Sequence, residues 1–169
     1  MILPIVKYGH PVLHAPARPV DAVTADITRL IDDMVETMYA APGIGLAATQ
    51  VGVPLRVLVI DLSVGRQVGS QIQLVNPVFV ERDGAQYEDE GCLSLPGYTA
   101  RVHRDAHVIV EGLDREGNAV RHDASGLLAR AFQHEIDHLD GRIYLDHLRG
   151  LKRELILRGI RKQQRQGKW

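Results

Sequence analysis

Two histidines and a glutamate in the segment QHEIDHLDG have the spacing of a metal-binding helix. His134 and His138 lie four residues apart, so on a helix both imidazoles project from one face and can converge on one ion, with Glu135 beside them. Ala131 and Leu127 continue this face as an apolar stripe, which directs the histidines inward. Two histidines that merely fall four apart are the alternative, because so short a motif also arises by chance.

A catalytic metal site needs a third protein ligand and one open coordination position. His147 lies downstream, but in a charged segment that we expect to be exposed. Cys92, the single cysteine, lies upstream in EDEGCLSLPG, where acidic residues and a glycine precede it and Pro96-Gly97 follow, which indicates a shaped turn. A free cysteine is more often a small buried hydrophobic residue. A Cys-His-His set suits Fe(II), Zn(II), Co(II) or Ni(II).

The glycine-rich stretch GIGLAATQVG, residues 43–52, matches the G-x-G-x-x-A form of a dinucleotide-binding turn. Such a turn requires a strand before the glycines and a helix after them. Residues 25–39 have apolar side chains at helical spacing after Thr24, a plausible N-cap, and residues 53–62 are rich in β-branched residues typical of a strand. The order is reversed, so we predict no nucleotide cofactor. A plain glycine-rich connection, however, leaves Gln50 unexplained.

The elements expected around these motifs are strands first and helices last. The spacing and turn residues predict a strand over 72–80, a strand over 100–114 with an irregularity near Arg104-Asp105, a hairpin return in AVRHD, a helix over 126–139 capped by Ser125 and ended by Asp140-Gly141, and a helical segment over 147–164 with Leu148, Leu151, Leu155 and Ile160 available for packing. This order favours an α+β fold, with antiparallel or mixed β-sheets packed around the core helix that carries HExxH and with a C-terminal helix.

Length and composition indicate a single domain over residues 1–169, with an aliphatic core because hydrophobic residues make up 45% of the chain and aromatic residues only 5%. No apolar run approaches the roughly 18 residues that a membrane span needs, so no membrane contact is predicted. The start, MILPIVKYGHP, is interrupted by proline and lysine and lacks the apolar core of a signal peptide. One cysteine excludes an internal disulfide and suits a reducing cytoplasm.

Charge is distributed unevenly along the chain. Residues 149–169 hold eight lysines and arginines and one acidic residue, Glu154, whereas the whole chain has a net charge of −1. A charge run of this kind is commonly a solvated helix face. A contact with an anionic partner is the other interpretation.

The motifs GIGLAATQ, EGCLS and QHEIDH together resemble the signature motifs of the bacterial peptide deformylase family, in the expected order and spacing. The resemblance extends from ILPIVKYGHPVLHAPARPV to HLDGRIYLDHL. It implies a metal-dependent hydrolase that removes the N-formyl group from the N-terminal formyl-methionine of new polypeptides and releases formate. It also implies Fe(II) as the native ion, with Zn(II), Ni(II) or Co(II) in some preparations.

The resemblance assigns roles to single residues. Cys92, His134 and His138 would hold the ion and leave water as the fourth ligand. Glu135 would take a proton from that water and pass it to the leaving amine. Gln50 and the backbone N–H of Leu93 would stabilise the negative charge that develops on the formyl oxygen.

The resemblance also implies a peptide-binding pocket. Gly45 would pair with the extended substrate as a strand does, and the glycines would let the backbone approach closely. Ile44, Leu127 and Ala131 are candidates for the apolar slot that takes the methionine side chain, although each of them fits equally well in the core.

Glu90 and Arg104 flank the Cys92 segment, and we expect them to pair and hold it in place. Two solvated charges are the commoner outcome for surface residues. For the basic segment 149–169, a cotranslational enzyme suggests docking on ribosomal RNA, which would be sensitive to salt.

Two rival functions remain at this point. An HExxH peptidase that cuts internal bonds would need a third His or Glu ligand downstream, where none has a matching context. A non-catalytic module stabilised by zinc would need four protein ligands, and only three are convincing.

Overall fold

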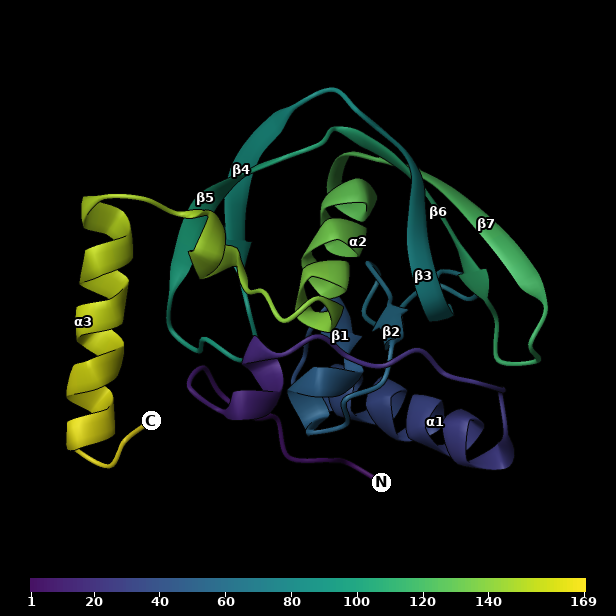
Figure 1. The fold of residues 1–169 in the computed structure, drawn as a ribbon, viewed down its shortest axis with the longest axis horizontal. Coiled ribbons are helices and arrows are strands. Elements are labelled where there is room, and N and C mark those ends of the chain that lie inside the picture. Colours follow the sequence, from purple (N-terminus) through teal and green to yellow (C-terminus); the bar gives the residue numbers. More distant parts are fainter.

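The computed structural model describes residues 1–169, and a single helix, α2, lies at the centre of the fold with strands on both sides of it (Figure 1). A five-stranded antiparallel sheet of order β1-β2-β3-β6-β7 lies on one side, and the two-stranded sheet β4-β5 lies on the other. The helices are α1 (Ala25–Ala40), α2 (Gly126–Leu139) and α3 (Leu151–Arg165), with the 3₁₀ turns η1 (Pro11–His14), η2 (Ala48–Val51) and η3 (Tyr144–His147). The strands are β1 (Gly45–Ala47), β2 (Val57–Ile60), β3 (Ile72–Asp83), β4 (Gln86–Gly91), β5 (Thr99–Arg104), β6 (His107–Leu113) and β7 (Ala119–Ser125).

Helix α2 is held by apolar packing against the large sheet. Phe132, Ile136 and Leu139 project from one face of the helix and are almost completely buried. They belong to one cluster with Leu58 of β2 and Val110 of β6. Because burying such side chains contributes roughly 1.5–3 kcal/mol each, this face fixes the rotation of α2, and with it the direction of its remaining side chains.

Two further apolar clusters complete the core. Helix α1 packs on the sheet through Ile31, Met34 and Met38, which are fully buried. The third cluster joins the β4-β5 hairpin to α3, through Val102 on β5 and Ile160 on α3. Helix α3 lies at the edge of the molecule, beyond that hairpin (Figure 1).

The predicted α+β fold and its two principal helices are confirmed, since α1 and α2 cover almost the predicted residues. The side chains of Thr24 and Ser125 make no capping hydrogen bond, although both residues hold the N-cap position. Gly141 ends α2 with a positive φ of 78°, a conformation that favours glycine.

The single strand predicted over 100–114 is wrong, because this segment forms β5 and β6 in different sheets. The strand conformation is interrupted at Asp105. The N–H of Asp105 donates to Oε1 of Gln133 (2.9 Å), and its carbonyl accepts from Nε2 of the same side chain (3.0 Å). A glutamine on α2 therefore satisfies the backbone groups that a neighbouring strand would have used.

Other element boundaries also differ from prediction. The strand expected over 53–62 is confined to β2, and the glycine-rich stretch is not a plain connection, because it contains β1 and η2. The prediction also placed the apolar face of α3 on the wrong residues. Leu151 and Leu155 are 72% and 50% exposed, and Ile156 and Leu157 are buried in their place beside Ile160.

No helix is both long enough and apolar enough to cross a membrane.

Candidate metal centre

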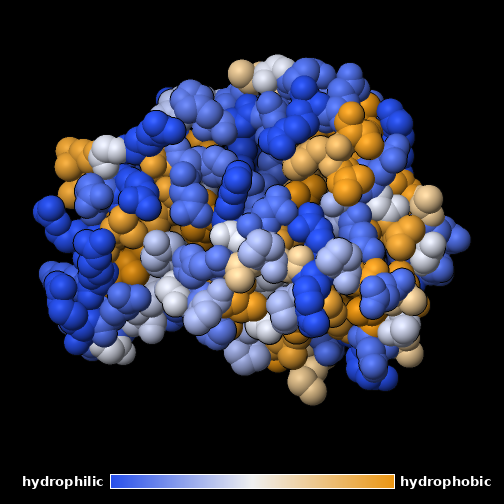
Figure 2. Space-filling view, viewed as in Figure 1, coloured by the Kyte–Doolittle hydropathy of each residue, from blue (hydrophilic) through white to orange (hydrophobic).

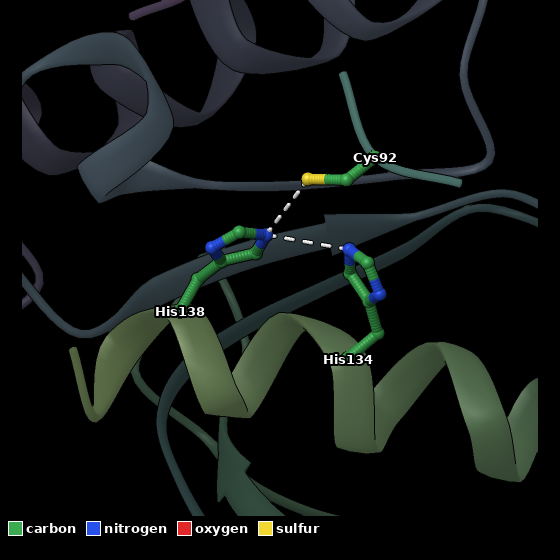
Figure 3. A group of neighbouring side chains, drawn as sticks. All are labelled: Cys92, His134 and His138. Carbon is green, nitrogen blue, oxygen red and sulfur yellow. Dashed lines mark hydrogen bonds between the residues drawn. The ribbon is translucent and has the colours of Figure 1, made fainter. Parts of the chain in front are cut away.

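Three side chains from two separate parts of the chain meet beside α2 (Figure 3). Cys92, directly after β4, and His134 and His138 on α2 point their donor atoms at one another. Nε2 of His138 lies 3.3 Å from Sγ of Cys92 and 3.3 Å from Nε2 of His134. All three donor atoms lie within 4.8 Å of one another.

These separations fit one tetrahedral ion. With metal–nitrogen and metal–sulfur bonds of about 2.05 and 2.3 Å, tetrahedral angles place two nitrogens about 3.4 Å apart and nitrogen and sulfur about 3.6 Å apart. The observed values of 3.3 Å differ little from these. The residues therefore fit a metal ion held by one thiolate and two imidazoles, and three ligands leave a coordination position open.

Glu90 fixes the orientation of His134. Oε1 of Glu90 lies 2.8 Å from Nδ1 of His134, so that nitrogen donates to the carboxylate and leaves the lone pair of Nε2 free to face the other donors. Arg104 in turn donates from Nε and Nη2 to the two carboxylate oxygens of Glu90, at 2.8 and 2.9 Å. The expected pairing of Glu90 with Arg104 is therefore present, and both side chains are buried rather than solvated.

The electrostatics of this buried cluster favour a cation. Burial alone would raise the pKa of Glu90, but hydrogen bonds from Arg104 and His134 lower it to about 2, so this carboxylate is ionised. Burial disfavours a charged His134, yet hydrogen bonds to Cys92 and Glu90 outweigh it and raise its pKa well above 6.5. Burial, together with His134, holds the pKa of His138 well below that value. These groups thus favour one positive charge at His134 and none at His138, and a metal ion bound by the three donors would supply that charge in place of a proton.

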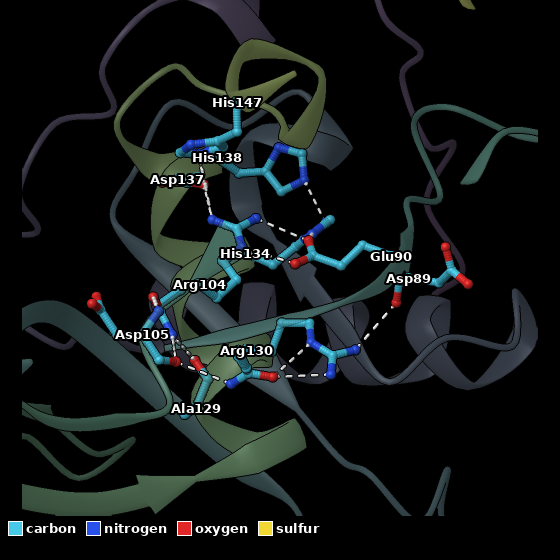
Figure 4. Close-up of polar contacts among 12 residues, drawn as sticks. Asp89, Glu90, Arg104, Asp105, Ala129, Arg130, His134, Asp137, His138 and His147 are labelled. Carbon is cyan, nitrogen blue, oxygen red and sulfur yellow. Dashed lines mark hydrogen bonds and ion pairs between the residues drawn. The ribbon is translucent and has the colours of Figure 1, made fainter. Parts of the chain in front are cut away.

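The outer part of this network is not foreseen by the sequence. Nη1 of Arg104 donates to Oδ2 of Asp137 (2.5 Å), and Nε2 of His147 lies 2.7 Å from the same oxygen (Figure 4). Asp137 therefore lies next to His147 rather than next to either histidine of the HExxH motif. His147 is not a third donor, because its Nε2 contacts Asp137 and Arg104 and it is not part of the group of donor atoms around Cys92.

Glu135 lies beside the donors with one oxygen unpaired. Burial raises the pKa of this carboxyl to about 7, and Oε2 is buried without a hydrogen-bond partner. Its neighbour is Gly45, where an added Cβ would come within 2.5 Å of Oε1 of Glu135. A Cβ on Gly43 would meet Leu93 at 2.8 Å. The two glycines of the GIG motif therefore lie close to Glu135 and Leu93, so their lack of a side chain serves close packing at this site and not the binding of a phosphate.

Gln50 faces the Cys92 segment from η2. Its Oε1 accepts from the N–H of Ala47 (3.0 Å), which fixes the amide so that Nε2 points toward Sγ of Cys92 (3.6 Å) and Oγ of Ser94 (3.1 Å). The backbone N–H of Leu93 donates to no protein acceptor. Gln50 thus places one N–H donor beside the Cys92 thiol, and the next residue in the chain, Leu93, has a backbone N–H that is not used by the protein.

A cavity of about 460 Å³ opens beside these groups. It contains all four residues expected to bind substrate, Ile44, Gly45, Leu127 and Ala131, as well as Gln50, Cys92, His134 and Glu135. Ile44 and Leu127 are partly exposed at its rim, whereas Ala131 also belongs to the core cluster of α2. The sequence missed other lining residues, namely Gly43, Asp89, Gly91, Leu95, Pro96, Gly97, Tyr98 and Arg130.

The edge of the large sheet faces this cavity. β1 is an outer strand of that sheet, and Asp61 N–H donates to the carbonyl of Ile44 (2.8 Å). In an antiparallel pair the bonded residues alternate, so the N–H and C=O of Gly45 point away from β2. An extended peptide could add to this edge as a further strand.

The chain resembles characterised and solved proteins over its whole length. The family model described as polypeptide deformylase matches residues 2–154. A peptide deformylase of Acidobacterium capsulatum is 50% identical over 169 residues, covering 100% of this chain and 99% of that protein. One of Thermodesulfovibrio yellowstonii is 52% identical and covers 92% and 94%.

Solved structures of peptide deformylases also superpose on almost the whole chain. A crystal structure of a peptide deformylase from Legionella pneumophila superposes with a TM-score of 0.92 at 41% identity, covering 99% of this chain and 98% of that one. A peptide deformylase from Ehrlichia chaffeensis in complex with actinonin gives 0.89 at 37% identity, with coverage of 97% and 98%. By sequence and by structure, the chain belongs to the polypeptide deformylase family.

Proposed function

We propose that the cavity beside α2 is where this chain carries out the reaction of its family, removal of the formyl group from the formyl-methionine end of nascent peptides with release of formate. The observation that carries this proposal is that Cys92, His134 and His138 converge, and that Cys92, His134 and Glu135 line one cavity with a free strand edge at its rim. Neither an internal peptidase nor a closed zinc module is favoured by any feature of this site.

Cys92, His134 and His138 hold one divalent metal ion, and we assign Fe(II) as the native ion, with Zn(II), Ni(II) or Co(II) able to replace it. A thiolate with two imidazoles is a donor set that all four ions accept. When bound, the ion supplies Lewis acidity toward the formyl oxygen and the attacking water.

Glu135 is the general base and then the general acid. Its pKa of about 7 lies near the working pH, where a carboxylate can take a proton from water and its conjugate acid can return that proton to the leaving amine. The unpaired Oε2 has no competing protein donor. Glu135 therefore moves the proton that the hydrolysis requires.

Gln50 and Leu93 stabilise the developing negative charge. Nε2 of Gln50 and the free N–H of Leu93 both lie at the Cys92 segment, so they can donate to a formyl oxygen placed beside the donors. Ile44, Leu127 and Ala131 offer apolar surface to the methionine side chain, and Gly45 pairs with the peptide backbone.

Formate release tests this proposal directly. Enzyme purified without oxygen, or reconstituted with Co(II) or Ni(II), would be given a short formyl-Met peptide, with the acetyl-Met peptide as the control. We expect turnover of the formyl peptide only, and loss of turnover in Glu135→Gln with the metal retained. No formate from fully metallated protein would contradict the assignment.

We further propose that α3 docks the enzyme on ribosomal RNA, and that residues 1–169 work in the cytoplasm as one catalytic domain. Lys152, Arg158, Arg161, Lys162 and Arg165 are exposed. Hydrophilic residues dominate the lower left of Figure 2, where Figure 1 places α3.

Ribosome pelleting at low and moderate salt would test the docking. Replacing Arg158, Arg161, Lys162 and Arg165 together with glutamine should weaken binding and reduce its dependence on salt, because fewer phosphates are neutralised. Equal, salt-independent pelleting of both proteins would contradict the proposal.

A further inference from the structure

Tyr98 connects the substrate cavity to α3. It lines the cavity with Pro96 and Gly97, at the end of the segment that starts at Cys92. It makes no hydrogen bond to the three donor residues or to Glu135; its hydroxyl instead accepts from Nε2 of Gln163 on α3 (3.1 Å). One residue therefore forms part of the cavity wall and part of the contact with α3.

The fit between Tyr98 and α3 leaves no spare room. Gly159 lies directly against the ring, and an added Cβ there would come within 2.3 Å of the Tyr98 hydroxyl oxygen and 3.1 Å of Cζ. Gly159 has an ordinary helical backbone in the middle of α3, a position where glycine is unfavourable compared with alanine. Its backbone conformation does not require glycine; the position of Tyr98 does.

A second connection reaches the same segment from the residues after α3. The indole Nε1–H of Trp169 donates to the carbonyl of Tyr8 (2.9 Å), and the N–H of Tyr8 donates to the carbonyl of Ser94 (2.9 Å). The hydroxyl of Ser94 accepts from Gln50 (3.1 Å). Tyr98 and Trp169 also pack together, with ring centroids 6.2 Å apart. Residues 151–169 thus brace residues 92–98 at two points.

We propose that Tyr98 is a positioning residue for the substrate peptide and that α3 sets its place, so that α3 forms the back of the cavity wall. Because Tyr98 lines the cavity without touching the donors, its displacement affects how the residues after methionine are held rather than the chemistry at the formyl group. This inference rests on the proposed function, since it assumes that the cavity binds the substrate.

Gly159→Ala tests the proposal with a single methyl group. The substitution favours helix formation, so a purely structural role predicts an equal or higher Tm and unchanged kinetics. We expect instead that the methyl group displaces Tyr98, and that kcat/KM for a formyl-Met tripeptide falls about tenfold, mainly through KM, because small misplacements of positioning groups are costly. The value for formyl-methionine amide, which has no following residue, should stay the same.

Rescue by a second substitution separates this effect from general damage. Tyr98→Phe removes the atom nearest to the new methyl group, so Tyr98→Phe/Gly159→Ala should recover most of the lost kcat/KM, a non-additive result expected only for residues in contact. Glu154→Ala, at an exposed position of α3, is the matched control and should leave kcat/KM unchanged for both substrates.

Each outcome decides a different question. An unchanged ratio between the two substrates in folded Gly159→Ala overturns the proposal, as does a loss that Tyr98→Phe does not recover. If Gly159→Ala does not fold, Gln163→Ala takes its place and should raise KM for the tripeptide about threefold, as for one lost hydrogen bond; no change would overturn the proposal. No formate from metallated wild-type enzyme with either substrate would instead refute the proposed function.

Discussion

The side chain of Glu90 has two roles, as acceptor for His134 and as partner of Arg104, so its charge should matter for the metal. Glu90→Gln keeps the shape and removes the anion that orients His134. We expect metal affinity to fall about 10- to 100-fold, as for other outer partners of histidine ligands. Competition with a chromophoric chelator would measure it.

Glu88→Gln is the matched control for this prediction. Glu88 lies two residues earlier on the same strand and is exposed, so the same change in charge should leave metal affinity unaltered. Equal affinity in Glu90→Gln and wild type would show that the hydrogen bond to His134 does not support the site.

Arg104→Ala should instead lower the free energy of unfolding by about 3–5 kcal/mol, because it leaves Glu90 buried without its partner.

His107 lies at the start of β6, outside the group of Cys92, His134 and His138, and offers a test by pH. Hydrogen bonds to Asp83 and Asp123 (3.0 and 2.6 Å) raise its pKa above 6.5. Because the folded pKa is the higher one, the interaction stabilises the fold fully below 6.5 and loses its effect as the pH rises through the folded value. NMR titration should show this raised pKa, and Asp123→Asn should lower it.

His122 is the internal reference for that titration. Burial lowers its pKa, so it should titrate below 6.5 in the same spectra while His107 titrates above. If the two histidines titrated together, the hydrogen bonds around His107 would have no electrostatic effect in solution.

Prediction from sequence succeeded for side chains whose type and spacing indicate metal binding. It failed for contacts between side chains that are distant in the sequence. Cys92, His134 and His138 were expected together and lie together. Nothing in the sequence placed Asp137 beside His147, or Tyr98 against Gly159, because those contacts depend on where α2 and α3 cross other segments. Glu90 and Arg104 were expected to pair, but their burial, which makes the pair strong, was not predictable.

Among the elements, the short strand β1 matters for the site because its first residue, Gly45, has no side chain. A methyl group at Gly45 would be placed 2.5 Å from Oε1 of Glu135. We expect Gly45→Ala to keep its metal and lose roughly 10²-fold in kcat/KM, because Glu135 would be pushed from its working position. Formate release and metal analysis on the same preparation would test this.

Gly91 is the control for Gly45, because an added Cβ has more space there. An added Cβ at Gly91 would find Thr99 Cγ2 at 3.5 Å, an ordinary contact, although Gly91 lines the same cavity. Gly91→Ala should keep most of the activity. Similar losses in the two variants would mean that backbone flexibility, and not the space for Glu135, explains Gly45.

The strands were harder to predict than the helices, for physical reasons. α1 and α2 have long apolar faces of helical period, which need no knowledge of their partners. β4 has the sequence QYEDEG, with charged residues on a strand whose buried position, Glu90, is itself charged. Its strand conformation is stabilised by pairing with β5 and by Arg130, which donates to Gln86 and to the carbonyl of Asp89.

In the molecule as a whole, the metal site joins two apolar clusters that otherwise belong to different sheets. His134 and His138 lie on α2, which packs in the cluster of the five-stranded sheet, whereas Cys92 packs against the cluster of β5 and α3. A bound ion therefore crosslinks the two halves. The crosslink exists only in the folded chain, so the ion should stabilise the entire fold.

Metal removal should thus lower Tm as well as abolish activity. A ligand present at 1,000 times its Kd stabilises a protein by about 4 kcal/mol, and a chain of this size shifts by roughly 2–4 °C per kcal/mol. We expect chelation to lower Tm by about 10 °C in calorimetry, with one transition before and after. Glu135→Gln retains all three donors and should show the same shift, whereas His138→Ala should show little. An equal Tm with and without metal would mean that the two halves are held together by packing alone.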